Sequence, residues 1–93
     1  MSVVILGGNE CMVRQYKDLC REYQCSAKVI SKMGGTLKNR LGKPDLLVMF
    51  TDTISHKMVK CAMNEIRGVN PAIARSKSSS MAALRNILET HAG

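Results

Sequence analysis

The sequence feature that most constrains the fold is a short apolar run that leads directly into an amphipathic helix. Residues 46–51 read Leu-Leu-Val-Met-Phe-Thr, and an apolar run of this length is typical of a strand buried on both faces. Beyond it, the apolar residues between Met58 and Ile66 recur at the spacing of one helix face. A strand that is buried on both faces belongs in a parallel sheet covered by helices, so this stretch predicts an α/β fold.

The rest of the 93-residue chain alternates in the same way. Further strands are predicted at 3–7, 26–31 and 72–75, and helices at 10–23, after a cap at Asp52 or Thr53, and after Ser78–Ser80, with a short helical turn at 36–41. Strands that alternate with helices are joined by right-handed crossovers and form parallel sheets. We therefore expect one α/β domain over residues 1–93. It should be a small Rossmann- or flavodoxin-like three-layer sandwich whose four-stranded parallel sheet has the order 2-1-3-4.

The composition indicates an intracellular protein with an anionic ligand. No apolar run approaches the roughly 20 residues that span a bilayer, and the first residues lack the basic leader of a signal peptide, which predicts a cytoplasmic location and no membrane contact. The four cysteines include no Cys-x-x-Cys pair and are expected to be reduced thiols. A formal net charge of +7 favours an anionic ligand. An aromatic content of 3% argues against nucleic acid, because proteins that bind single strands stack the bases on aromatic side chains.

Several motifs give the chain a family resemblance. They are the Gly7-Gly8-Asn9 turn, the Pro44-Asp45-Leu46 lead-in, the Phe50-Thr51 strand end, Ser55-His56-x-Met58 and Ser78-Ser79-Ser80. With these motifs the chain resembles, over nearly its whole length, the bacterial domain of unknown function 2325 family. The resemblance implies the fold and a site around Ser55-His56, but no settled activity. Relatives often carry a histidine in the last strand-to-helix loop, where this chain has Lys77, so a two-histidine site is not expected here.

Three loops are expected to meet at one edge of the sheet. They follow the first, third and fourth strands, and the crevice beyond the carboxyl ends of parallel strands is where ligands bind in open α/β sheets. Their side chains combine one imidazole and one thiol with hydroxyls and cations. The candidate binding residues are Gly8, Asn9, Cys11, Thr51, Ser55, His56, Arg75, Lys77, Ser78 and Ser79.

One ligand that suits these residues is a haem-like cofactor with His56 as the axial metal ligand. A neutral imidazole is a common axial ligand of haem iron, and a methionine or cysteine can supply the second. The candidates for that second ligand are Cys11, Met12 and Met58. Arg75 and Lys77 would face the carboxylates of the cofactor.

The alternative ligand is a phosphate-bearing metabolite or nucleotide bound at helix N-termini. Free backbone amides and the positive end of the helix dipole attract anions there, and Gly7-Gly8 would allow close approach. Serines are also common helix caps, however, and neither a Gly-x-Gly-x-x-Gly fingerprint nor a Walker loop occurs. We therefore favour the haem-like ligand over the phosphate-bearing one.

Two further interpretations stay open. An enzyme would need Cys11 and His56, oriented by Asp52, to meet across the crevice as nucleophile and base, and sequence spacing does not show such geometry, so no catalytic residue is assigned. The other interpretation is a non-catalytic oligomeric interaction module. Because the second and fourth strands form sheet edges, and a small sheet often covers its edges by self-association, we expect a homo-oligomer.

Overall fold

The computed structural model describes residues 1–30, 43–66, 68 and 71–91. Its strands are β1 (Ser2–Leu6), β2 (Ser26–Ile30), β3 (Leu46–Phe50) and β4 (Ala72–Ser76). Its helices are α1 (Val13–Glu22), α3 (His56–Glu65) and α4 (Met81–His91), and a 3₁₀ turn, η1 (Glu10–Met12), precedes α1. The predicted helical turn at 36–41 lies outside the described residues.

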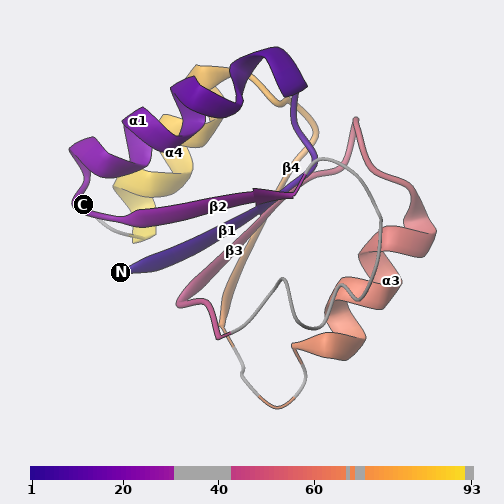
Figure 1. Cartoon of the computed structure of the whole chain (residues 1–93). Helices are drawn as coiled ribbons and strands as arrows, with labels where there is room; N and C mark the ends of the chain where they lie inside the picture. The colour runs from indigo at the N-terminus through magenta and orange to yellow at the C-terminus, as the bar shows by residue number, and fades with distance from the viewer. Residues whose placement is uncertain (31–42, 67, 69–70, 92–93) are drawn as a thin grey trace.

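The described strands form one parallel sheet in the order β2-β1-β3-β4, which confirms the predicted fold class and strand order (Figure 1). Every residue of β3 is buried. In the register, Val48 of β3 lies opposite Ile5 of β1 and Ala74 of β4, so these three side chains point to one face of the sheet. The residues between them point to the other face. A helix layer covers each face, which is why the central strand has an unbroken apolar sequence instead of an alternating one.

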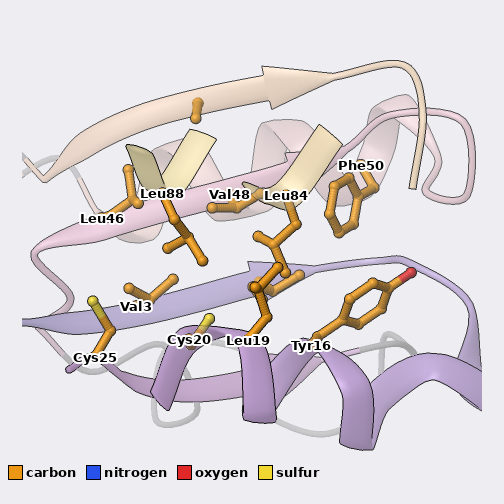
Figure 2. Close-up of a cluster of buried hydrophobic side chains, with 12 residues drawn as sticks. Val3, Tyr16, Leu19, Cys20, Cys25, Leu46, Val48, Phe50, Leu84 and Leu88 are labelled. Atoms are coloured by element: carbon orange, nitrogen blue, oxygen red, sulfur yellow. The ribbon is translucent and has the colours of Figure 1, made fainter. Parts of the chain in front are cut away.

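Helices α1 and α4 lie side by side on one face of the sheet, and α3 lies on the other (Figure 1). The core beneath α1 and α4 is built from Val3, Ile5, Tyr16, Leu19, Cys20, Cys25, Leu46, Val48, Phe50, Ala74, Leu84 and Leu88 (Figure 2). The core beneath α3 is built from Val4, Leu6, Ile30, Leu47, Met49, Met58, Ala62 and Ile66. Among the described helices, none is both long and apolar enough to cross a membrane.

The start of α3 differs from the prediction. Ser55, and not Asp52 or Thr53, is the N-cap, because its Oγ accepts a hydrogen bond from the Met58 amide (3.2 Å). The Thr53 hydroxyl instead donates to the Phe50 carbonyl (3.1 Å) and closes the turn that follows β3. As a result, the helix begins at His56, and this residue shares a hollow with Thr51, just after β3, and Arg75 of β4.

Candidate functional site

Two adjoining hollows lie where β3 and β4 end and α3 begins. The inner hollow, of about 100 Å³, is lined by Thr51, Ile54, His56, Val59 and Arg75. The outer hollow is more open, has a volume of about 390 Å³, and is lined by Thr51, His56, Arg75, Ser76 and Lys77. Because the two share three residues, we treat them as one site, the His56 pocket. The outer hollow alone falls within the range of about 300–1,000 Å³ that is usual for small-molecule sites.

The register of the sheet places Arg75 and Thr51 in the His56 pocket. Arg75 lies opposite Met49, which packs in the core beneath α3, so the Arg75 side chain leaves the strand on the α3 face. Thr51 is held beside the end of β4 because its amide and its hydroxyl both donate to the Ser76 carbonyl, at 2.8 and 3.2 Å. The strand ends therefore form the base of the pocket.

The first turn of α3 forms the wall of the pocket. His56 is the first residue of the helix and is exposed to solvent. Val59 lies one turn further along and therefore faces the same side, and together with Ile54 it places apolar surface beside the imidazole. The sequence could have indicated Val59, since it follows His56 by three positions, which is one helical turn.

The rim of the pocket is positively charged. Arg75 and Lys77 are both exposed, and within the described part of the chain neither forms an ion pair with a carboxylate. Asp52, the acidic residue of the turn after β3, accepts a hydrogen bond from the Ser79 hydroxyl (3.5 Å). The two cations are therefore available to an anionic ligand, which would lose little solvation in meeting them at the surface.

Ser55, Ser78 and Ser79 support the loops around the pocket and do not line it. Ser55 caps α3, as described above. The Ser76 hydroxyl donates to the Ser78 carbonyl (2.8 Å), and the Ser80 amide donates to Ser78 Oγ (3.3 Å). Ser80 in turn accepts from the Ala83 amide (3.2 Å) and caps α4. These bonds set the path of the chain from β4 to α4.

Gly8, Asn9 and Cys11 also lie outside the lining of the His56 pocket. The Gly8 amide donates to Thr53 Oγ1 (2.7 Å), and the Asn9 side chain accepts from the Cys11 amide (2.9 Å). Cys11 itself is exposed on η1. The turn after β1 is thus joined to the turn after β3, but its side chains do not reach the hollows at the end of β4.

The two glycines of this turn are needed for close packing. Both have positive φ angles, +86° at Gly7 and +90° at Gly8, which side chains rarely tolerate. A Cβ atom on Gly7 would lie 2.6 Å from Ile54 Cγ2, and one on Gly8 would lie 2.8 Å from Tyr16 Cε2. The Gly-Gly pair therefore lets β1 approach its neighbours, and this packing accounts for it without a bound phosphate.

Tyr16 is a residue whose role the helical periodicity did not reveal. Its ring is fully buried in the core beneath α1 and α4, 5.5 Å from the Phe50 ring between centroids (Figure 2). Its hydroxyl, however, accepts from the Asn9 amide (3.2 Å) and donates to the Ser79 carbonyl (2.5 Å). Its residue type could have indicated these contacts, because the hydroxyl of a buried tyrosine usually forms a hydrogen bond.

None of the three candidates for a second iron ligand lines the pocket. Met58 is buried in the core beneath α3. The Met12 sulfur lies 3.9 Å from the Tyr16 hydroxyl oxygen, and Cys11 is on η1. Moreover, the described residues contain no group of three or more His, Cys, Asp or Glu side chains that could hold a metal ion.

A family model described as "Uncharacterized protein conserved in bacteria" matches residues 2–91, nearly the whole chain. No curated protein matches the chain, and no solved structure does. The comparisons therefore establish the family of the chain without pointing to an activity. An activity has to be inferred from the residues of the His56 pocket.

Proposed function

Because the chain belongs to the domain of unknown function 2325 family, for which no activity is described, its function has to be inferred from its site. We propose that it binds an amphipathic anionic cofactor of the haem type in the His56 pocket, with the His56 imidazole as an axial ligand of the iron.

The observation that carries this proposal is the combination of groups in one pocket. An exposed imidazole lies beside the apolar side chains of Ile54 and Val59, and the cations Arg75 and Lys77 lie at the rim. A macrocycle needs all three: a nitrogen ligand for its iron, apolar contacts for its ring, and cations for its carboxylates. A free phosphate would make no use of the apolar wall.

The arrangement of possible metal ligands also favours a macrocycle over a bare metal ion. A structural metal site usually requires about four protein ligands, and the described residues provide no group of even three. A haem supplies four nitrogens of its own, so one imidazole is enough to anchor it. When bound, a haem brings an iron whose remaining axial position can take part in ligand exchange or electron transfer.

The backbone amides that would hold a phosphate are engaged within the protein. The amides of Gly7, Gly8 and Asn9 donate to the Ile30 carbonyl, to Thr53 Oγ1 and to the Tyr16 hydroxyl. At the start of α4, the amides of Ser80 and Ala83 donate to serine hydroxyls. A phosphate at these turns would have to displace these bonds, which weakens the nucleotide alternative.

The proposal is tested by titrating the purified protein with haemin and following absorption in the Soret region. Wild type should develop a Soret band, and His56→Ala should lose it or bind at least tenfold more weakly. His91→Ala is the matched control, since His91 is also exposed but lies at the end of α4, and it should bind as wild type does. The absence of a band, or equal binding by the two variants, overturns the proposal.

A phosphate-bearing ligand remains the second candidate, because Thr51, His56, Arg75 and Lys77 also surround the outer hollow with polar and cationic groups. Inorganic phosphate or a nucleotide that binds only the folded state should raise the melting temperature. Arg75→Ala should abolish that increase, whereas a wild type that phosphate and nucleotides leave unchanged would eliminate this candidate.

A further inference from the structure

We propose that a second copy of the chain covers the bound cofactor, so that one ligand lies between the His56 pockets of two chains. This inference rests on the proposed function, and it assigns the second axial position to His56 of the second copy.

The pocket leaves one side of a ligand uncovered. His56 is exposed, and the outer hollow is open to solvent. Within the described residues, no cysteine, methionine or second histidine lines the pocket. A cofactor held by His56 would therefore present its far face, including the second axial position of its iron, away from the described part of this chain.

An exposed apolar residue lies next to this open side. Ile73 of β4 is 37% exposed, and Met1 is the only other large hydrophobic residue so exposed in the described part of the chain. In the register, Ile73 lies opposite Leu47, which packs beneath α3, so Ile73 and Arg75 leave β4 on the same face. A partner that covers Ile73 would therefore lie on the same face as the His56 pocket, two residues along β4 from Arg75.

Charge decides under which condition two copies can pair. Each chain has a formal net charge of +7, and Arg75 and Lys77 are at the rim. Two such rims repel each other, but the carboxylates of an anionic cofactor between them would neutralise the repulsion. If a two-fold axis through the ligand relates the two chains, each face of the ligand meets the same imidazole, apolar side chains and cations. The pairing is therefore expected only when the ligand is bound.

The test combines sedimentation velocity with haemin titration. Wild type should be monomeric alone and dimeric with haemin, with an end point of one haemin per two chains and the low-spin spectrum of ferric iron with two imidazole ligands. Ile73→Asp should stay monomeric while still binding haemin through its single His56, with one haemin per chain.

Ala72→Asp is the matched control, because it introduces the same charge in the same strand at an exposed position on the opposite face, and it should dimerise as wild type does. A wild type that binds one haemin per chain and remains monomeric overturns this inference while leaving the proposed function intact. Equal dimerisation of wild type and Ile73→Asp also overturns it. A wild type without a Soret band overturns the proposed function itself.

Discussion

A single hydroxyl group, that of Tyr16, connects two loops at the carboxyl edge of the sheet. It accepts from the Asn9 amide in the turn after β1 and donates to the Ser79 carbonyl in the loop before α4. The two loops are far apart in sequence, so neither contact could be inferred from local spacing. Because its ring is buried against Phe50, the hydroxyl is held in place by the same packing that forms the core.

At this scale we predict the effect of Tyr16→Phe. The substitution keeps the ring but leaves a partly buried amide and carbonyl without their partner, which costs about 1–3 kcal/mol of unfolding free energy. Urea denaturation followed by circular dichroism measures the loss. Tyr23→Phe is the control, since the exposed Tyr23 hydroxyl donates only to Glu89 (3.1 Å) at the surface, and a loss as large as that of Tyr16→Phe would contradict the prediction.

Among the elements, α3 contributes most to the proposed site. Its first residue provides the imidazole, its next turn provides Val59, and its cap Ser55 sets where the helix begins. The end of β4 provides Arg75 and, just beyond it, Lys77. The pocket therefore depends on how the start of one helix meets the end of one strand.

At the scale of the element we predict that Ser55→Ala weakens ligand binding as well as stability. Loss of an N-cap costs about 0.5–2 kcal/mol, and it frays the turn that holds His56, so haemin affinity should fall severalfold. Ser80→Ala is the control, because Ser80 caps α4 and does not line the pocket. Ser80→Ala should lower the thermal stability by a similar amount and leave the haemin affinity unchanged. Equal losses of haemin affinity in the two variants would contradict the prediction.

The two faces of the whole molecule differ in character. Helices α1 and α4 close one face over the core that contains Tyr16 and Phe50, whereas α3 is the described helix on the other face (Figure 1). Ile73 and Arg75 are exposed on the α3 face. The closed face contains two buried thiols, Cys20 and Cys25 (Figure 2). Burial, with a smaller contribution from Cys25, raises the pKa of Cys20 from 9.0 to about 11.

This shift predicts how the stability of the molecule depends on alkaline pH. Well below pH 9 the Cys20 thiol is protonated in both the folded and the unfolded state and contributes no pH dependence. Between pH 9 and 11 it ionises in the unfolded chain but not in the folded one, so the unfolding free energy should decline as pH rises through this window. Urea denaturation at several pH values measures the slope.

Two variants separate Cys20 from other groups that titrate at alkaline pH. Cys20→Ala should flatten the decline, whereas Cys11→Ala, which replaces an exposed thiol, should retain it. Desolvation and, to a smaller extent, the hydrogen bond to Glu89 also raise the pKa of Tyr23 above 10.0, so part of the decline above pH 10 should remain in both variants. A slope that Cys20→Ala leaves unchanged would show that another group is responsible.

The elements of the fold were predictable because their sequence signals are local. The apolar run of β3 and the helical stripe of α3 each lie within a short stretch of chain, and the alternation of strands with helices predicts a parallel sheet. The bounds of β1, β2, β3 and β4 differ from the predicted ones by a residue at most. The cap of α3 was misplaced because Asp52, Thr53 and Ser55 are all good capping residues, and hydrogen bonding of Thr53 to Phe50 decided among them.

Only some of the predicted binding residues line the His56 pocket. Thr51, His56, Arg75 and Lys77, all predicted to bind, line the pocket together. Thr51 and Lys77 directly follow β3 and β4, Arg75 lies near the end of β4, and His56 begins α3. Gly8, Asn9, Cys11, Ser55, Ser78 and Ser79 lie in the predicted loops but outside the lining. Sequence indicates which loops share an edge, but not how tightly the turn after β1 packs against Tyr16 and Ile54.

By itself, then, the sequence determined the α/β class, the parallel sheet with its order, and the edge at which polar side chains collect. The class and the parallel sheet depend on periodicity and on the alternation of strands with helices, which are legible over short stretches of chain. Only the tertiary structure decided that the pocket lies between the end of β4 and the start of α3, away from the turn after β1. That choice depends on contacts between residues distant in the chain, in which Gly7, Gly8 and Tyr16 fill the space nearer β1 and leave the hollow beside His56 open.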